Sequence, residues 1–309
     1  MVSAALKLEP IPAAAPSERR TEIMLRDVAV EYPSERRAKK TILADINLEI
    51  VAGEFVVILG ETGCGKSTLL RLILGQEFPT AGSVIVDGKA VTHIDARCGY
   101  VPQKYSLFPD RTVLGNVLYG PENARSRFLG RLQPSFYRER RALRNEAESY
   151  LKRMGLQPQD FNKYPHQLSG GMQQRVAIAQ ALLMKPPVLL MDEAFSALDP
   201  STRSSLQEQL HRIWTESRPT VIFVTHNTAE ALLMGTRLIL LGRQREGSSA
   251  RKNLLLDMEI PTARLPFAAR KKNSEFQQLQ EYVADLAHRS SSMCVDEEPA
   301  ESPVEGNLR

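Results

Sequence analysis

The feature of this 309-residue chain that most constrains its fold is a glycine-rich stretch at residues 60–68, which reads GETGCGKST. It fits the pattern G-x-x-x-x-G-K-[ST], whose backbone N–H groups surround a phosphate. An apolar, β-branched run at residues 54–59 predicts a buried strand before it. Residues 67–74 predict a helix after it, which Gly75 ends. A strand, a glycine loop and a helix N-terminus together predict an anion site, because the helix dipole favours negative charge.

Two side chains in this stretch have the chemistry of a nucleotide site. Lys66 is expected to reach the β- and γ-phosphates, and the Ser67 hydroxyl is expected to bind Mg²⁺. An incidental glycine turn is the alternative, and the flanking strand and helix argue against it. The residues predicted to contact ATP here are Gly60, Glu61, Thr62, Gly63, Cys64, Gly65, Lys66, Ser67 and Thr68.

The composition is that of a soluble globular protein, with 42% hydrophobic and 25% charged residues. No apolar run is long enough to span a bilayer and no N-terminal signal is evident, so we expect a cytosolic protein whose membrane role comes through a partner. Cys64, Cys98 and Cys294 lack metal-site spacing, which favours reduced thiols. A net charge of +4 is too weak to indicate nucleic-acid binding.

The chain alternates between strand and helix patterns after an Ala- and Pro-rich lead at residues 1–20, which we expect to be disordered. A strand at 21–32, a basic hairpin turn at 33–40 and a second strand pair around Ala52 and Gly53 are predicted to follow. A turn is expected at 79–83. Further strands are predicted at residues 83–89, 98–103, 188–193, 219–226 and 237–241, with helices at 201–217 and 228–235 and a mainly helical section at 107–185.

This alternation predicts a mainly parallel sheet. Gln103, Asp192, Glu193 and His226 each come at or just after the end of a predicted strand. In open α/β sheets, ligands bind at the edge formed by the carboxyl ends of the strands. We therefore expect these four residues to lie beside the phosphate loop.

Asp192 and Glu193 follow four apolar residues, and an ordinary helix or loop start with two acids is the alternative explanation of that pattern. The functional interpretation is a Walker-B pair. In it Asp192 holds Mg²⁺ and Glu193 polarises the attacking water.

A second phosphate-binding helix start is predicted at Ser169, Gly170 and Gly171, just before an amphipathic helix. With this LSGG sequence and the motifs above in the same order, the chain resembles the ATP-binding-cassette (ABC) family over residues 21–242. The resemblance implies an α/β P-loop NTPase cassette. Its parts are a mainly parallel core sheet, an antiparallel β subdomain and an α-helical subdomain at about residues 104–185.

The resemblance also implies roles for single residues. Tyr32 matches the aromatic residue that stacks on adenine, although a core tyrosine at a strand end is the alternative. Gln103 matches the glutamine that touches Mg²⁺ and senses the membrane partner. Residues 196–199, ending at Asp199, match the D-loop, which crosses the dimer interface. His226 matches the switch histidine that contacts the γ-phosphate. Ser169, Gly170 and Gly171 are implied to close the ATP site of a second copy in a head-to-tail dimer.

Within the family the chain looks most like the ATPases of nitrate, sulfonate and taurine importers. That likeness implies a peripheral subunit on the cytoplasmic face of the inner membrane, bound to an integral permease and served by a solute-binding protein. The chain departs from the family pattern at Glu61-Thr62, Ala194, Asn227 and Thr236. The last two positions usually hold Asp, so negative charge is lost there.

Two regions are less informative. Seven arginines at residues 125–144 are explained either by a solvated basic loop or by contact with anionic lipid or an acidic permease loop. In the extension at 243–309, apolar residues at helical spacing predict one amphipathic helix packed on the core, and its acidic end is expected to be disordered. The apolar residues of that helix are Phe276, Leu279, Val283 and Leu286.

Two other functions remain open at this point. A soluble ABC ATPase acting on DNA or ribosomes is one, although the chain lacks the long coiled coils, zinc inserts and second cassette of those relatives. A regulatory module without catalysis is the other, and the intact Lys66, Asp192, Glu193 and His226 argue against it.

Overall fold

The computed structural model describes residues 20–33, 40–94, 96–104, 107–125, 134–243 and 253–292. Its strands form two sheets. The first is antiparallel, in the order β2-β1-β4-β5. Its strands are β1 (Thr21–Tyr32), β2 (Lys40–Val51), β4 (Ala81–Val86) and β5 (Lys89–Ala90).

The second, central sheet has the order β10-β9-β3-β8-β7-β6. All its neighbouring strands are parallel except β10, which runs antiparallel to β9. The predicted parallel sheet is therefore confirmed. Its strands are β3 (Phe55–Gly60), β6 (Cys98–Val101), β7 (Val188–Asp192), β8 (Thr220–Thr225), β9 (Arg237–Leu241) and β10 (Leu254–Glu259).

Two local predictions need correction. The strands on either side of Ala52 and Gly53 are not a pair, because β2 belongs to the antiparallel sheet and β3 to the central one. The turn predicted at residues 79–83 is also shorter, since β4 begins at Ala81. Both turns exist, but their flanking strands are set by tertiary packing. β2 and β3 pair in different sheets, and β4 begins at Ala81 because that residue pairs with Ala29 of β1.

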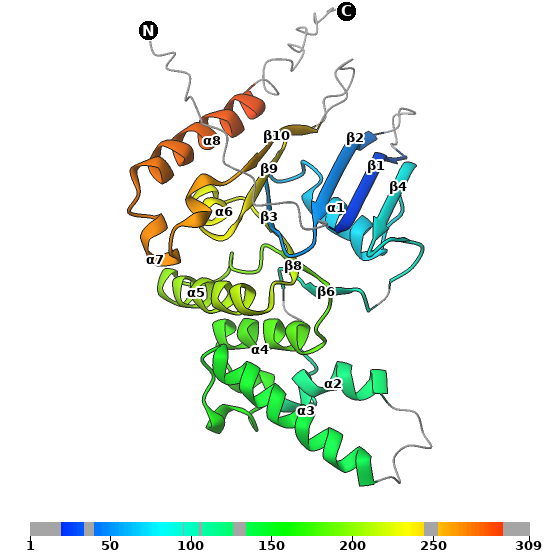
Figure 1. Cartoon of the computed structure of the whole chain (residues 1–309), viewed down its shortest axis with the longest axis vertical. Coiled ribbons are helices and arrows are strands. Elements are labelled where there is room, and N and C mark those ends of the chain that lie inside the picture. Colours follow the sequence, from blue (N-terminus) through cyan, green and yellow to red (C-terminus); the bar gives the residue numbers. More distant parts are fainter. Residues whose placement is uncertain are drawn as a thin grey trace, which may run out of the picture.

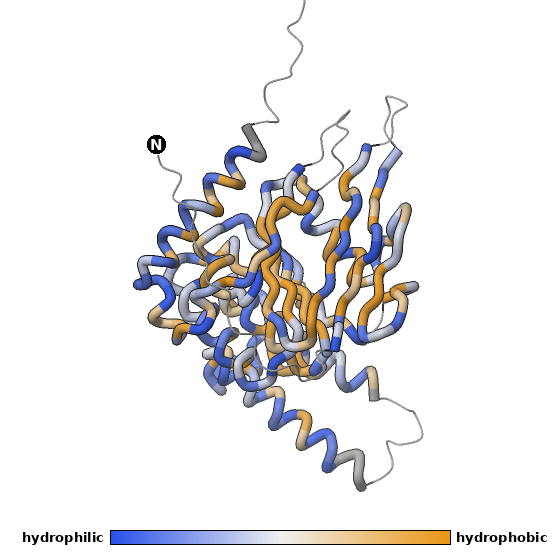
Figure 2. Tube along the Cα trace, turned by 45° about the horizontal axis from the view of Figure 1, so that its top comes forward, coloured by the Kyte–Doolittle hydropathy of each residue, from blue (hydrophilic) through white to orange (hydrophobic). Residues whose placement is uncertain are grey.

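The central sheet is covered on both faces, as its nearly continuous apolar strands require. Along β3, Val56 and Ile58 pack toward the antiparallel sheet and α1 (Lys66–Leu74). Phe55, Val57 and Leu59 pack toward the helices of the other face. This alternation follows from the two-residue period of a strand. Figure 2 shows the resulting apolar interior as orange strands, with bluer helices beside and below them.

Two groups of helices between β6 and β9 lie in different places. The mainly helical section is confirmed as α2 (Val113–Arg125), α3 (Pro134–Arg153) and α4 (Gly170–Leu183), with short 3₁₀ turns η2 (Pro158–Asp160) and η3 (Pro165–Gln167). It gathers at the end of the molecule farthest from β1 and β2 (Figure 1). The central sheet is flanked instead by α5 (Pro200–Ser217) and α6 (Thr228–Met234).

Part of the basic section lies on α3, and its charge is partly neutralised. Arg140 pairs with Glu122 at 3.1 Å, and Arg144 pairs with Glu148 at 3.1 Å. Residues 126–133 lie outside the described part of the chain, as do the predicted disordered lead at 1–19, most of the basic turn, at 34–39, and the acidic end at 293–309.

The C-terminal extension is more ordered than the sequence indicated. The predicted helix is confirmed as α8 (Ser274–Ser292), with Phe276 and Val283 buried. It is preceded by β10, η4 (Pro261–Arg264) and α7 (Phe267–Arg270), which were not predicted. The guanidinium of buried Arg270 donates to the carbonyls of Leu233, Ala263 and Leu265. It thereby ties the extension to the last turn of α6.

Candidate nucleotide site

The phosphate loop connects the end of β3 to α1, and its backbone requires glycine at two points. A Cβ on Gly60 would lie 2.5 Å from the carbonyl oxygen of Leu241. Gly65 has φ +104°, and a Cβ there would lie 2.6 Å from Leu43 Cδ2. Gly65 is also the N-cap of α1, and no side chain caps that helix. The first N–H groups of α1 are therefore available to an anion.

Lys66 is buried beneath this loop. Its Nζ donates to the carbonyl oxygens of Gly60 at 2.7 Å and Glu61 at 2.6 Å. The ammonium is therefore fixed across the loop by neutral acceptors, with no carboxylate partner among the described residues, and its charge is left to act on a phosphate. Cys64 is buried in the same loop, and this burial raises the pKa of its thiol, so it remains a packing residue.

Ser67 and Asp192 lie together at the start of α1 and the end of β7. The Ser67 hydroxyl donates to Asp192 Oδ1 at 3.4 Å. Desolvation raises the pKa of Asp192, against the opposing effect of this hydrogen bond. A carboxylate and a hydroxyl at a desolvated position suit Mg²⁺, which prefers oxygen ligands and would offset the cost of burying the charge.

Glu193 lies between Gln103 and His226, two of the other predicted catalytic residues. Gln103 Nε2 donates to Glu193 Oε2 at 2.9 Å, and His226 Nδ1 lies 3.3 Å from Glu193 Oε1. Glu193 has φ 44°, an uncommon value for a residue other than glycine, and its N–H donates to the carbonyl of Val224 on β8. The parallel strands thus bring Gln103, Glu193 and His226 to one point, as predicted.

Two cavities adjoin at this edge. One of about 400 Å³ is lined by Tyr32, Ile42, Thr62, Gly63, Gly65, Lys66, Ser67, Thr68, Arg71, Gln103, Asp192 and Glu193. Another of about 520 Å³ is lined by Leu59, Gly60, Glu61, Thr62, His226, Thr228, Ala284, Ala287 and His288. Arg71 was missed by sequence reasoning, although its position four residues after Ser67 puts it on the same face of α1. The contribution of α8 had no sequence signal.

Ser169, Gly170, Gly171 and Asp199 line neither cavity. Ser169 caps α4, its Oγ accepting from the N–H of Met172 at 3.3 Å. Asp199 caps α5, and bonds from Thr202 and Ser201 lower the pKa of its carboxyl. The Asp-Pro pair that opens α5 is a sequence signal for this capping role. Within one copy, the N-terminus of α4, predicted to bind phosphate, is therefore separate from the phosphate loop.

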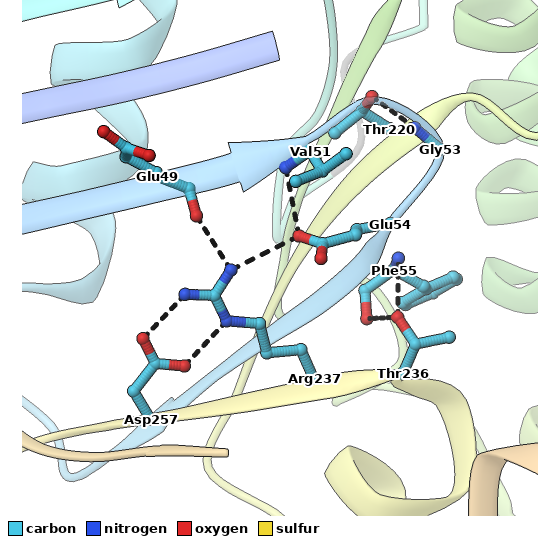
Figure 3. Close-up of polar contacts among 9 residues, drawn as sticks. All are labelled: Glu49, Val51, Gly53, Glu54, Phe55, Thr220, Thr236, Arg237 and Asp257. Atoms are coloured by element: carbon cyan, nitrogen blue, oxygen red, sulfur yellow. Dashed lines mark hydrogen bonds and ion pairs between the residues drawn. The ribbon is translucent and has the colours of Figure 1, made fainter. Parts of the chain in front are cut away.

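Two of the residues that depart from the family pattern form hydrogen bonds that account for their presence. Asn227 caps α6, accepting from the N–H of Glu230 at 3.0 Å, as an Asp there would also do. The Thr236 hydroxyl accepts from the N–H of Phe55 and donates to its carbonyl, both at 3.1 Å. Figure 3 shows these two bonds beside the contacts of Arg237. Ala194 is buried, and nothing in the structure explains the absence of proline there.

The sequence that forms this site is similar to those of known proteins. The model of the family described as ABC transporter matches residues 43–196. The bicarbonate transport ATP-binding protein CmpD of Synechocystis sp. is 37% identical over 281 residues, which cover 90% of this chain and 94% of that protein. The nitrate import ATP-binding protein NrtD of Synechococcus elongatus is 39% identical over 214 residues, covering 69% and 74%.

Among solved structures, the dimeric ATP-binding cassette MJ0796, in a post-hydrolysis state bound to ADP and Pi, matches with a TM-score of 0.63. It is 33% identical, and the match covers 77% of this chain and 98% of that one. None of the helices in the described residues combines the length and the apolarity of a membrane span. These similarities agree with the fold and with the position of two carboxylates beside the phosphate loop. The chain belongs to the ABC transporter family, as one of its ATP-binding and ATP-hydrolysing subunits.

Proposed function

We propose that this subunit powers the uptake of a small oxyanion or related solute through an integral membrane permease. Two of the relatives above carry names that specify transport of bicarbonate and import of nitrate, both small oxyanions. The solute class rests on these names and on the motif resemblance, because an ATPase subunit does not touch the solute. The permease and a solute-binding protein would select it.

The observation that best supports the ATPase role is the position of Glu193 between Gln103 and His226, next to the phosphate loop. Glu193 would orient and polarise water, while His226 would contact the γ-phosphate. Lys66 would bind the phosphates, and Tyr32 would stack on the adenine at the mouth of the same cavity. Ser67, Asp192 and Gln103 would hold Mg²⁺, which supplies charge neutralisation on the phosphates.

The second half of the site would come from another copy. Ser169 to Gly171 and Asp199 lie outside the nucleotide cavity of their own chain, as expected if they act across a head-to-tail dimer. The dimeric form of the MJ0796 cassette supports this arrangement. The resulting dimer would sit as a peripheral complex on the cytoplasmic face of the inner membrane and would not act on nucleic acid.

The test is affinity purification of the tagged chain from its own membranes, followed by an ATPase assay. We expect one polytopic membrane protein to co-purify and the reconstituted pair to hydrolyse ATP faster than the subunit alone. A Lys66→Ala chain should retain the membrane partner and lose the hydrolysis. Recovery of ribosomes or DNA in place of a membrane protein would refute the transport role and support the alternative of a non-transport ATPase.

A further inference from the structure

A separate cavity of about 370 Å³ lies at the other edge of the central sheet, where β3, β8 and β9 begin. The β2–β3 turn and the end of α5 form one side, and the end of β10 with η4 forms the other. It is therefore built jointly by the cassette and the C-terminal extension. The lining residues used below are Glu54, Trp214, Arg218, Arg237, Glu259 and Arg264.

The walls of this cavity are fixed by hydrogen bonds (Figure 3). Arg237 binds both carboxylate oxygens of Asp257 at 2.7 Å, the carbonyl of Glu49 at 2.8 Å and Glu54 at 3.4 Å. The N–H of Gly53 donates to Thr220 Oγ1 at 3.0 Å. These bonds join the β2–β3 turn, β8, β9 and β10, so the cavity exists without a ligand.

The charges around the cavity are unequally matched. Glu54 and Arg237 neutralise each other with the help of Asp257. Arg218 and Arg264 are both exposed, and neither has an ion pair with any residue that the structure describes. Glu259 has none within the same residues. The rim therefore presents two unmatched cations and one unmatched anion.

Trp214 gives the cavity an apolar side. Its indole is almost fully buried, with 3% exposed, and the guanidinium of Arg218 lies 4.2 Å from its ring centroid. This stacking holds Arg218 over the cavity wall and leaves its N–H edge for another partner. Ile260 and Ala263 extend the apolar lining.

We propose that this cavity binds a small organic anion, with its carboxylate or sulfonate group at Arg218 and Arg264 and its apolar body against Trp214. The volume is in the range of small-molecule sites, larger than a bare inorganic oxyanion needs. Guanidinium groups suit planar or branched oxyanions because they donate paired N–H bonds. The proposal is independent of ATP hydrolysis and of the transported solute, since the phosphate loop lies at the opposite end of β3.

Trp214 is the only tryptophan in the chain, so its fluorescence reports directly on this cavity. The protein is titrated with butyrate and with propanesulfonate at constant ionic strength, and with neutral butyramide as the uncharged counterpart. We expect a saturable change in emission with both anions and none with butyramide.

The variants then locate the site. Arg264→Gln and Arg218→Gln should each weaken anion binding by about 5- to 10-fold, the effect of one charged hydrogen bond at a partly exposed position. Glu259→Gln should tighten it by about 2-fold, because a repelling charge is removed. Arg212→Gln is the matched control: that arginine is on the same helix, is exposed and pairs with Glu208, and its loss should change nothing.

Three results would overturn the proposal. One is the absence of any saturable change with either anion. Another is an equal response to butyramide, which would indicate apolar binding alone. The third is a response that survives both arginine variants and disappears in Lys66→Ala, which would assign the anion to the phosphate loop.

Discussion

The two edges of the central sheet both carry charged side chains, but these differ in whether they have partners of opposite charge. Where the strands begin, Arg237 has two carboxylates and a carbonyl as partners. Where they end, the acidic side chains of Asp192 and Glu193 meet a hydroxyl, an amide and an imidazole, and the nearby Lys66 is bound to carbonyls. Arg237 is therefore matched within the folded protein, whereas the charged groups at the other edge are left for MgATP.

The origin of the difference is the C-terminal extension. It supplies Asp257 through β10 and thereby provides the main ionic partner of Arg237 at the first edge. At the second edge the extension supplies a wall formed by α8, without a cation against the carboxylates. Substitutions at the first edge should therefore change stability, and those at the second should change activity.

The largest effect is expected for Glu193→Gln. The amide keeps the shape of the side chain but cannot accept a proton, so the rate constant for ATP hydrolysis should fall about 100- to 1,000-fold. ATP affinity and the free energy of unfolding should stay near the parent values. Turnover, nucleotide binding and thermal unfolding are measured together.

Glu208→Gln on the exposed side of α5 serves as its control and should leave hydrolysis unchanged. Hydrolysis by Glu193→Gln at the parental rate would contradict the role of Glu193 and remove the contrast between the edges.

Asp257→Ala tests the edge where the strands begin, at the ion pair between Asp257 and Arg237. The substitution removes two short bonds to Arg237, whose pKa Asp257 raises, and leaves that arginine only partly matched. The free energy of unfolding should fall by about 2 kcal/mol. ATP affinity should stay unchanged, because the nucleotide lies at the other end of the strands. Chemical denaturation and nucleotide titration measure both.

Asp285→Ala is the matched control. Asp285 also pairs with an arginine, Arg289, at 2.8 Å, but both side chains are more than half exposed. Its loss should change stability by less than about 0.5 kcal/mol. Equal losses for the two variants would show that the Asp257 contact has no special weight.

Much of the edge where the strands end, which holds the nucleotide site, could be predicted from the sequence. The glycine pattern located the phosphate loop, and Gly75 ended α1 where expected. Gln103, Glu193 and His226 were expected to meet because parallel strands share one edge, and their side chains are within bonding distance. Local pattern and sheet geometry were sufficient there.

The edge where the strands begin could not be predicted in the same way. Leu254, Leu256 and Met258 alternate with exposed residues, which is a strand pattern, but β9 as its partner is a tertiary fact. Thr236 replaces the usual aspartate, and its hydroxyl accepts a hydrogen bond from the N–H of Phe55, which is 181 residues away in sequence. Such long-range partners leave no local signal.

Thr236→Val should have an intermediate effect on stability. Valine keeps the shape but leaves the buried N–H of Phe55 without its acceptor, which should cost about 1.5 kcal/mol. Thr236→Ser retains the hydroxyl and should remain within about 0.5 kcal/mol of the parent. Chemical denaturation distinguishes the two. A valine variant as stable as the serine variant would mean that the hydroxyl does not replace the usual acid.

The smallest effect, and the only gain in stability, is expected for Asp192→Asn. Burial raises the pKa of Asp192, so the fold disfavours the ionised form relative to the unfolded chain. The parent therefore loses stability as pH rises through the pKa of the folded state, and the asparagine variant does not. At pH 7 without nucleotide, the variant should be more stable by up to about 1 kcal/mol.

That gain should shrink as pH is lowered toward the ordinary pKa of an aspartic acid, because the parent carboxyl then becomes neutral as well. MgATP should reverse the order, raising the melting temperature of the parent well above that of the variant, since only a carboxylate can bind the cation through charge. Melting curves at two pH values, with and without MgATP, test both signs. A variant less stable than the nucleotide-free parent at pH 7 would mean that the charge of Asp192 is already satisfied in the fold, and the two edges would then be alike.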